Sequence, residues 1–328
     1  MEKDGMSEGE DWDALRNARP GPHTHVETAT QCRSTHKPDL NQAFWSHESR
    51  PKLFRYIINN VNVCKEPDLS ILFMIHSMPD HRKLRNLVRE TWGSVKEYNG
   101  VKIEHAFLLG AGGNDSSVKE ESKKHHDIIQ ANFQDTFMNK TLKSVIALRW
   151  ASTFCRKAKV VFKVNDNLLV NTYLVAKLME QHGYVKQREI ICGSLVSFPR
   201  DLEPTREASN RWTARRKVTM QQYPDQCFPT HCLGLGGYGL TPEYGEALYQ
   251  QATRTRSMPL EDVYITGLLP ALLQQPVTKL RVGGFAYLRG PITMNWVLKV
   301  AFIAVSNEEE KPLQRYKEAW NIIYTKHT

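Results

Sequence analysis

A cluster of polar side chains follows a short apolar run near the middle of the chain. Residues 160–164 (VVFKV) are typical of a buried strand, and Asn165, Asp166 and Asn167 come directly after it. Ligands of open α/β sheets bind beyond the carboxyl ends of the strands. Carboxylate and amide oxygens can also ligate a hard cation. The triplet is therefore a candidate binding site on its position alone.

Two adjacent carboxylates form a second candidate. Glu261 and Asp262 precede the apolar stretch 263–273. A carboxylate held near a reacting hydroxyl can take its proton as a general base. Acidic residues also favour the first turn of a helix, where they face the positive end of the helix dipole. The residues alone leave both interpretations open.

Other common catalytic patterns are absent from the sequence. The glycine-rich loop at residues 110–113 lacks the Lys-Ser/Thr of a phosphate-binding loop and the later glycine of a dinucleotide fingerprint, so we interpret it as a surface turn. No Gly-x-Ser-x-Gly elbow marks a serine hydrolase. No cysteine pair has zinc-site spacing, and the adjacent His125 and His126 would diverge on a helix.

The elements that position these residues can be predicted from periodicity. Strands are expected at 70–75, 106–110 and 160–164, and helices at 80–92 and from Thr172 to about residue 183; a further helix is indicated by Leu142, Ile146, Trp150 and Phe154, which recur every four residues. Alternating strands and helices predict an α/β fold with a mostly parallel central sheet. Residues 1–50 are expected to be a disordered tail or stem, and residues 51–328 a single domain.

Composition narrows the class of ligand. The chain has 328 residues and a net charge of +9, with its positive residues spread along the sequence. The sequence has no run of basic residues interleaved with aromatic residues, the pattern that would indicate nucleic-acid binding. A protein of that class would bind DNA or RNA with an affinity that falls steeply as the salt concentration rises. A diphosphate-bearing substrate accounts for the same charge. Six cysteines and two glycosylation sequons, at Asn114 and Asn139, are compatible with a secretory lumen, although no signal or membrane-spanning run is visible.

A series of blocks over about residues 69–270 resembles the β1,3-galactosyltransferase family, glycosyltransferase family 31. The segment DTFMNKTLK, for example, is similar to the family motif D-x-Y-x-N-L-T-L-K, and KVNDN stands where the family has K-x-D-D-D. The blocks follow the family order over about residues 69–270. They are RNLVRETWG at 85–93, EESKKHHDII at 120–129, DTFMNKTLK at 135–143, KVNDN at 163–167, the Tyr-Pro and Cys-x-Gly stretch at 223–238, and LEDVY at 260–264.

The resemblance implies a GT-A-like nucleotide-sugar fold and an inverting hexosyltransferase. Such an enzyme moves galactose or an N-acetylhexosamine from a UDP-sugar to a glycan hydroxyl in β1,3 linkage, on a glycoprotein or glycolipid. It also implies a manganese ion, a Golgi location and membrane association. Negative charge builds on the departing diphosphate, so a cation must stabilise it.

The motif positions imply a set of site residues. Asp262 is the expected general base. Residues that would contact the donor are Arg85, Arg89, Lys163, Asn165 and Asp166, and the metal would rest on Asp166 and Asn167. Trp92, Lys143, Gly236, Gly237 and Glu261 complete the motifs in supporting positions. Without the motif, two arginines four residues apart would be interpreted as a solvated helix face.

The sequence departs from the family pattern at the metal triplet. Asn165 and Asn167 replace the outer aspartates, so only Asp166 carries charge. Ser306 stands where a looser resemblance places a ligand histidine. Metal affinity falls with the number of charged ligands. One hypothesis is therefore a transferase with a weak or metal-independent site, in which Arg85, Arg89, Lys143 and Lys163 offset the leaving-group charge. The alternative is a catalytically impaired relative that binds a glycan or a partner protein.

Overall fold

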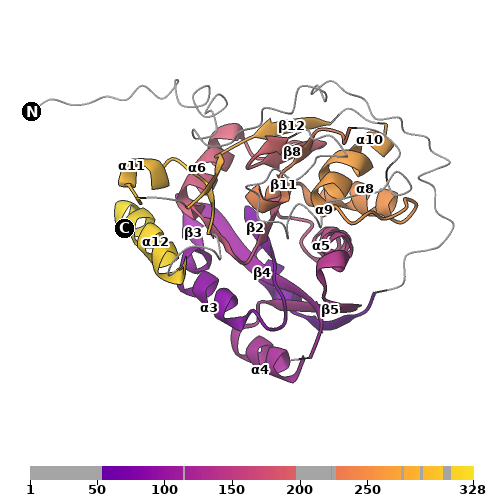
Figure 1. Cartoon of the computed structure of the whole chain (residues 1–328), viewed down its shortest axis with the longest axis horizontal. Coiled ribbons are helices and arrows are strands. Elements are labelled where there is room, and N and C mark those ends of the chain that lie inside the picture. Colours follow the sequence, from indigo (N-terminus) through magenta and orange to yellow (C-terminus); the bar gives the residue numbers. More distant parts are fainter. Residues whose placement is uncertain are drawn as a thin grey trace, which may run out of the picture.

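The computed structural model describes residues 54–113, 115–196, 223, 227–274, 277–288, 291–305 and 312–328. The expected tail at residues 1–50 and Ser306 lie outside this part of the chain. Within it the fold is α/β, with one large sheet flanked by helices (Figure 1).

The central sheet runs in the order β1-β5-β4-β2-β6-β11-β8-β12, with β3 paired to β4. Its core of β5, β4, β2 and β6 is parallel, β1 and β11 pair antiparallel with their neighbours, and β12 is parallel to β8. The strands are β1 (Tyr56–Asn59), β2 (Ile71–His76), β3 (Glu97–Tyr98), β4 (Val101–Ala111), β5 (Ile128–Gln134), β6 (Val160–Asn165), β8 (Glu189–Cys192), β11 (Tyr238–Leu240) and β12 (Thr278–Arg281).

Two smaller sheets complete the strands. One pairs β9 (Leu195–Val196) with β10 (His231–Cys232), and the other runs β13 (Phe285–Tyr287), β14 (Phe302–Ala304), β7 (Leu168–Val170). The mostly parallel α/β arrangement confirms the predicted fold class, in its GT-A-like form. The expected strands at 70–75, 106–110 and 160–164 correspond to β2, β4 and β6, although β4 begins five residues earlier than predicted.

Helices cover both faces of the sheet. Short 3-10 turns and one π-helical segment, η6, fill the connections. The longer helices are α3 (Arg82–Glu90), α4 (Asp115–His125), α5 (Lys140–Phe154), α6 (Thr172–His182), α8 (Pro242–Ala252) and α12 (Pro312–His327), and the short ones are α9 (Glu261–Val263), α10 (Leu269–Leu272) and α11 (Met294–Val297). The 3-10 and π segments are η2 (Val61–Cys64), η3 (Trp92–Ser94), η4 (Phe137–Asn139), η5 (Gly234–Gly236) and η6 (Tyr264–Leu268).

The core divides along the pleat of the central strands. Ile71, Phe73 and Ile75 of β2 belong to the cluster that includes α3, α6 and α12, whereas Leu72 and Met74 face the cluster under α5. Successive side chains of a strand point to opposite faces, so each face of β2 and β6 is committed to one cluster. A third cluster joins β8 and β11 to α8 and α10.

Helix α6 shows how local sequence sets an element. Its first-turn amide at Leu174 donates to the Asn171 side chain, so the cap lies one residue before the predicted Thr172. At its other end Gly183 adopts a left-handed conformation with φ of 72°, which glycine reaches without strain. The predicted end near residue 183 is confirmed.

Candidate active site

The polar triplet lies at the carboxyl end of β6, in the middle of the parallel sheet. Asn165 sits beside His76, the last residue of the neighbouring strand β2. The carboxylate of Asp166 is buried, and its Oδ2 lies 2.8 Å from Nδ1 of His81 at the start of α3. Hydrogen bonding to Asp166 raises the pKa of His81. The predicted location of the triplet, at a strand end, is confirmed.

Glu261 is the centre of a buried polar network under α5. Its Oε1 accepts hydrogen bonds from the hydroxyls of Tyr238 and Ser144, both at 2.7 Å, and its Oε2 lies 3.0 Å from Nζ of Lys163. Burial, followed by the charge of Glu261, holds the pKa of the Tyr238 hydroxyl well above its ordinary value. Lys163 therefore has its counter-charge inside the protein, as a buried lysine requires.

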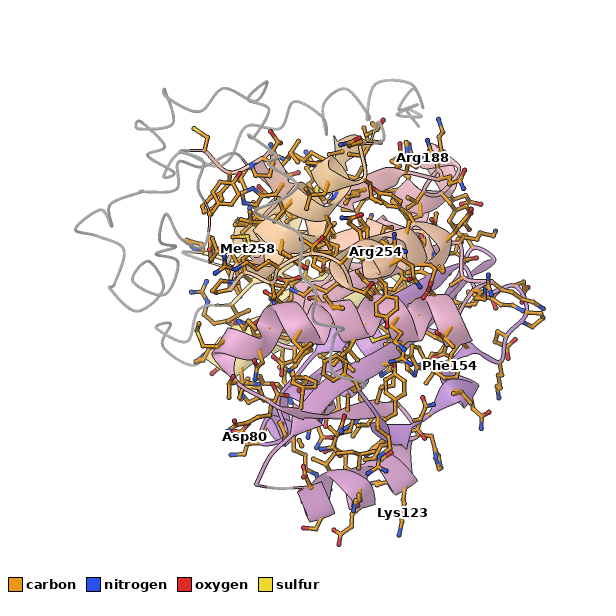
Figure 2. All side chains as sticks on the ribbon, turned by 90° about the vertical axis from the view of Figure 1, so that its right-hand side faces the viewer. Asp80, Lys123, Phe154, Arg188, Arg254 and Met258 are labelled. Atoms are coloured by element: carbon orange, nitrogen blue, oxygen red, sulfur yellow. A yellow bond between two sulfur atoms is a disulfide. The ribbon has the colours of Figure 1, made fainter. Side chains whose placement is uncertain are left out.

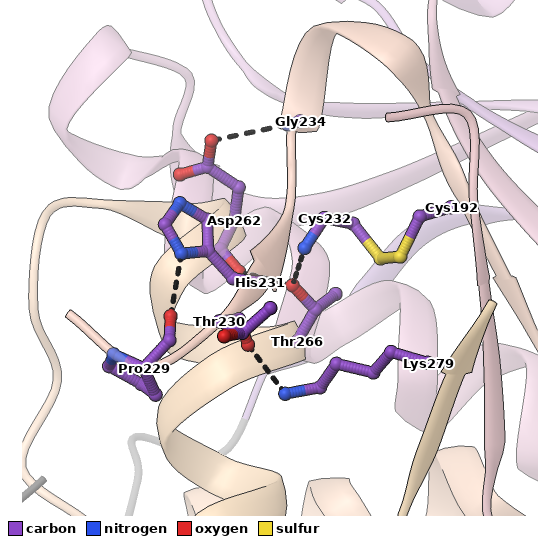
Figure 3. Close-up of a disulfide and its surroundings, with 9 residues drawn as sticks. All are labelled: Cys192, Pro229, Thr230, His231, Cys232, Gly234, Asp262, Thr266 and Lys279. Atoms are coloured by element: carbon purple, nitrogen blue, oxygen red, sulfur yellow. Dashed lines mark hydrogen bonds between the residues drawn. A yellow bond between two sulfur atoms is a disulfide. The ribbon is translucent and has the colours of Figure 1, made fainter. Parts of the chain in front are cut away.

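Asp262 is 5% exposed and is the second residue of helix α9, after Glu261. Its Oδ2 accepts a hydrogen bond from the backbone N–H of Gly234 at 3.1 Å, and Thr266 donates to its backbone carbonyl (Figure 3). A Cβ at position 234 would lie 3.0 Å from the Cβ of Asp262, so the close approach favours glycine. The interpretation of Glu261 and Asp262 as the start of a helix is thus correct for their backbone. Both side chains are buried in the protein.

Gly234 connects the triplet to this carboxylate. Its carbonyl accepts a hydrogen bond of 3.4 Å from the amide Nδ2 of Asn165, while its N–H points to Asp262. The following Gly237 has φ of 69°, a left-handed conformation, and packs against Val164 of β6. Gly236 approaches the ring of Phe285 in the same way. The glycine-rich stretch thus passes close to the end of β6.

Lysines gather around the same end of the sheet. Lys143 is buried; its Nζ lies 2.7 Å from Asp135 and 2.6 Å from the carbonyl oxygen of Ser77. Lys140, the first residue of α5, is exposed. Desolvation and then the charge of Lys163 lower the pKa of Lys140, while Glu261 and Asp166 act in the opposite direction. Burial, followed by the charges of Lys163, Lys143 and Lys140, holds the pKa of His76 at the end of β2 well below its ordinary value.

The structure gives Arg85 and Arg89 a supporting position. Arg85 is fully buried, and its donors go to both oxygens of Glu121, to Ser77 and to the carbonyls of Met78 and Pro79. These five bonds use its whole donor capacity. Arg85 thus fixes the loop that follows β2 through buried hydrogen bonds. The interpretation of this arginine as part of a solvated helix face is wrong.

Arg89 completes the same buried cluster one turn later on α3. Its guanidinium binds Glu121 at 2.7 Å and both oxygens of Asp127 at 2.7 and 2.8 Å. These bonds lower the pKa of Asp127 despite its burial. The arginine is about as buried as its partner, with 10% of its side chain exposed. Its contacts fix α3 to α4 and β5 rather than open it toward a ligand.

Sequence reasoning missed several members of the site. His76, His81, Ser144 and Tyr238 all contact or adjoin the predicted residues. Tyr238 ends one family-like block and Ser144 directly follows another, which was the available signal. The two histidines carried none, because nothing in their spacing indicates a site. Trp92 proves to be a core residue whose indole N–H bonds the carbonyl of Leu168 at 3.0 Å.

The residues present do not fit a manganese site. Of the triplet only Asp166 is charged, and its Oδ2 already bonds His81. Asn165 directs its amide nitrogen to Gly234, and Asn167 adds a neutral amide. Among the residues that the structure describes, no group of three or more His, Cys, Asp or Glu side chains could hold a metal ion. We therefore derive no chemistry from a bound metal.

Two disulfides have both of their cysteines within the described residues, and they join Cys64 to Cys155 and Cys192 to Cys232. Cys232 thus pairs with Cys192 across 40 residues, not with its sequence neighbour Cys227, which is itself disulfide-bonded. Figure 3 shows the Cys192–Cys232 bridge beside the turn that leads to Gly234.

No helix in the described ranges is long and apolar enough to cross a membrane.

Comparison with known proteins gives one consistent result. The sequence model of the galactosyltransferase family matches residues 83–280. The chain is 32% identical over 219 residues to beta-1,3-galactosyltransferase 1 of Homo sapiens and of Mus musculus, which covers 66% of this chain and 64% of the relative. It is 31% identical over 235 residues to beta-1,3-galactosyltransferase 2 of Mus musculus, covering 68% and 52% respectively.

The chain therefore spans about 64% of the length of the first of these relatives. Among solved structures, 4-diphosphocytidyl-2C-methyl-D-erythritol synthase from Anaerococcus prevotii is similar at a TM-score of 0.36 and 13% identity, over 67% of this chain and 88% of that one. That likeness is too distant to compare sites. The matched residues run from α3 to β12 and include both the polar triplet with Asp166 and the adjacent carboxylates Glu261 and Asp262. The chain belongs to the galactosyltransferase family.

Proposed function

We propose that the chain transfers a hexosyl residue, galactose or an N-acetylhexosamine, from a UDP-sugar to a hydroxyl of a glycan in β1,3 linkage. The reaction inverts the anomeric carbon. The acceptor hydroxyl attacks that carbon, its proton passes to a carboxylate, and the bond to the UDP phosphate oxygen breaks. A glycoprotein or a glycolipid provides the acceptor.

Asp262 is the base in this proposal. The supporting observation is the link through Gly234, which ties the buried carboxylate of Asp262 to Asn165 at the carboxyl end of β6. Ligands of such sheets bind at that end. The neighbouring Glu261 is engaged by three donors, from Lys163, Tyr238 and Ser144, so of the two adjacent carboxylates Asp262 is better suited to take a proton.

The test is a transfer assay with UDP-galactose, UDP-N-acetylglucosamine and UDP-N-acetylgalactosamine against β-linked acceptor sugars. Asp262→Asn keeps the size of the side chain and removes its basicity, so we expect turnover to fall by about 10²–10⁴-fold, the usual contribution of a general base. Retained UDP binding would show that the donor site survives. Asp68→Asn is the matched control, since that carboxylate is 60% exposed and lies before the start of β2, at the other end of the strand. Equal turnover in Asp262→Asn and the control would contradict the assignment.

A second function is favoured by the loss of charge in the triplet. A chain with one carboxylate there could bind a glycan or a partner protein without catalysis. In that case no UDP-sugar would be consumed by the wild-type chain, and acceptor glycans would bind equally well to wild type and Asp262→Asn. The retained Asp262 supports the transferase, because a binding protein has no evident need for a base.

The compartment follows from the same proposal. We place the domain in the Golgi lumen, where glycans of proteins and lipids are extended, with membrane association as in the family. The bridges Cys64–Cys155 and Cys192–Cys232 support an oxidising compartment. The location can be tested by labelling the protein in intact cells and by adding protease to intact membranes. A domain in the Golgi lumen should be protected from the added protease.

A further inference from the structure

A second hollow in the surface lies between the end of α3 and one face of α12. It has a volume of about 720 Å³, within the ~300–1,000 Å³ that is usual for small-ligand sites. Glu90 of α3 and Lys317 of α12 both line it, and their charged atoms lie 3.6 Å apart. Figure 1 shows the two helices alongside each other. The hollow is thus built from two elements that are far apart in the sequence.

This hollow is separate from the candidate active site. His81, which contacts Asp166, directly precedes α3, whereas Glu90 is the last residue of that helix. The 9 residues of α3 rise by about 13 Å. Figure 2 shows Asp80, the residue before His81, at the end of α5 that lies opposite Phe154. The residues that line the hollow include neither the polar triplet nor the adjacent carboxylates of α9.

The wall on α12 is a single face of the helix. Lys317, Trp320, Asn321 and Tyr324 follow one another at helical spacing, so they share that face. The ring centroids of Trp320 and Tyr324 are 6.1 Å apart, and their planes are inclined by 39°. Tyr324 is 47% exposed. The hollow therefore presents an aromatic surface to solvent.

Polar groups beside this surface are available to a ligand. Neither the amide of Asn321 nor the indole N–H of Trp320 forms a hydrogen bond with a residue of the described ranges. Asn321 is exposed, and the indole nitrogen is reached by solvent although Trp320 as a whole is only 5% exposed. On the opposite wall, the exposed Ser94 donates its hydroxyl to the carbonyl of Thr91, so its oxygen can still accept.

The composition of the lining favours an uncharged sugar ring. None of the described residues that line the hollow is aliphatic, so an apolar peptide side chain or a lipid chain finds little to pack against. The charges of Glu90 and Lys317 sum to zero, so an anion gains no net attraction. A hexose ring has C–H groups on its face, which pack on an aromatic ring, and hydroxyl groups at its edge, which need the donors and acceptors found here.

Buried contacts fix both walls of the hollow. The ring of Trp320 stacks on Tyr173 of α6, with centroids 6.1 Å apart and planes inclined by 11°. Trp92, in the turn after α3, donates its indole N–H to the hydroxyl of Tyr316 on α12 at 2.6 Å. Groups that are already ordered lose little entropy when a ligand binds. The site is therefore largely formed before its ligand arrives.

We propose that the hollow between α3 and α12 is a carbohydrate site that binds one hexose unit of a glycan. The ring of Tyr324 packs on the sugar, and the amide of Asn321 and the indole N–H of Trp320 bond its hydroxyl groups. The inference goes beyond the proposed function, because the site lies apart from Asp262 and needs no donor nucleotide. A branched glycan or a glycoprotein held there stays close to the catalytic residues, which raises its effective concentration at them.

Titration of the full chain with N-acetyllactosamine tests the site, since this probe contains both galactose and N-acetylglucosamine. The readout is the indole N–H resonance of Trp320 in the isotope-labelled protein, identified by its absence from Trp320→Phe. We expect this resonance to shift on titration in the wild type and in Asp262→Asn alike. Sorbitol, which has hydroxyl groups but no ring, should not shift it.

Variants at exposed positions of α12 show which side chain binds. Tyr324→Ala should lower the affinity for N-acetyllactosamine by about threefold to tenfold, the loss of one aromatic contact. Tyr324→Phe keeps the ring and should bind within about twofold of the wild type. Leu313→Ala is the matched control, since Leu313 is 46% exposed on the same helix and does not line the hollow.

Three outcomes would overturn the inference. They are no binding of N-acetyllactosamine by the wild type, binding that leaves the Trp320 resonance unmoved, and equal affinity in Tyr324→Ala and Leu313→Ala. None of them touches the proposed transferase, because UDP binding and sugar transfer are measured separately. A chain that transfers no sugar while the Trp320 resonance still shifts would contradict the proposed function and retain this site.

Discussion

At the scale of single residues, two adjacent carboxylates have opposite surroundings. Glu261 is enclosed by the ammonium of Lys163 and the hydroxyls of Tyr238 and Ser144. Asp262 accepts hydrogen bonds from the backbone N–H groups of Gly234 and Val263 instead. The first carboxylate is therefore the counter-charge of a buried ammonium, whereas the second is held by backbone amides. The motif position already singled out Asp262 as the expected base, but the partners of Glu261 could not be predicted, because Ser144 lies 117 residues away in sequence.

The pair of Lys163 and Glu261 gives a stability prediction. Removing either partner leaves the other charge buried, so Glu261→Gln and Lys163→Met should each lower the free energy of unfolding by about 3 kcal/mol. The double variant should lose less than the sum, since it leaves no unpaired charge. Urea unfolding measures all three. Strictly additive losses would contradict a coupled pair. Lys96→Met, at the exposed pair with Glu104, should cost less than about 1 kcal/mol.

At the scale of elements, the strands and helices that carry long patterns were predictable. Strands β2 and β6 are continuous apolar runs, and α5 repeats Leu142, Ile146 and Trp150 along one face. The antiparallel β11, inserted between β6 and β8, was not predictable, because three residues carry no period and its partners lie far away in sequence. Pairing of distant segments is decided by tertiary packing rather than by local propensity.

The same reason limits prediction of the site. The triplet and the carboxylates were found because they follow or precede recognisable elements. The bonds that make them a site cross long distances: Ser144 to Glu261 spans 117 residues, and Asn165 to Gly234 spans 69. His81 reaches Asp166 across 85 residues. No local pattern records such contacts. The buried network around Arg85 was hidden for the same reason, since its partner Glu121 lies on another helix.

Strands β2 and β4 each bury a histidine, which gives a pH prediction. Burial lowers the pKa of both His76 and His105 in the fold, whereas the unfolded chain keeps the ordinary value near 6.5. The unfolded state therefore binds more protons below pH 6.5. Their contribution to stability is fully present above that pH and is lost as the pH falls toward the folded pKa values, by up to about 1.4 kcal/mol per pH unit for each histidine.

Unfolding free energies measured by urea titration from pH 7.5 to 5 would show this slope. His76→Leu removes one of the two groups, so its slope should be lower by up to about 1.4 kcal/mol per pH unit. The comparison uses slopes, so a constant change in stability does not affect it. A slope identical to that of the wild type would show that His76 is protonated in the fold, contrary to its burial.

At the scale of the whole molecule, the two disulfides that lie wholly within the described residues constrain different elements around the site. Cys64–Cys155 ties η2 to the end of α5 beside Phe154, away from the end that carries Lys140. Cys192–Cys232 ties β8 to the turn before Gly234, where Leu233 also bonds the carbonyl of Ser194. The first bridge constrains the outer core, and the second holds the loop that contacts Asp262 and Asn165.

This arrangement predicts that loss of either bridge lowers the free energy of unfolding by a similar amount, and that loss of only one of them weakens ligand binding. Each closes a long loop, with sequence separations of 91 and 40 residues, so replacing either pair by alanine should cost about 2–5 kcal/mol in unfolding free energy. Only Cys192→Ala/Cys232→Ala should also weaken UDP binding, because it releases the Gly234 turn that links the triplet to Asp262. Calorimetry at a temperature where both variants remain folded separates the effects. Equal UDP affinity in the two variants would mean that the glycine turn is held by its backbone contacts with Ser194 and Asp262 alone, and that the bridge beside it serves stability only.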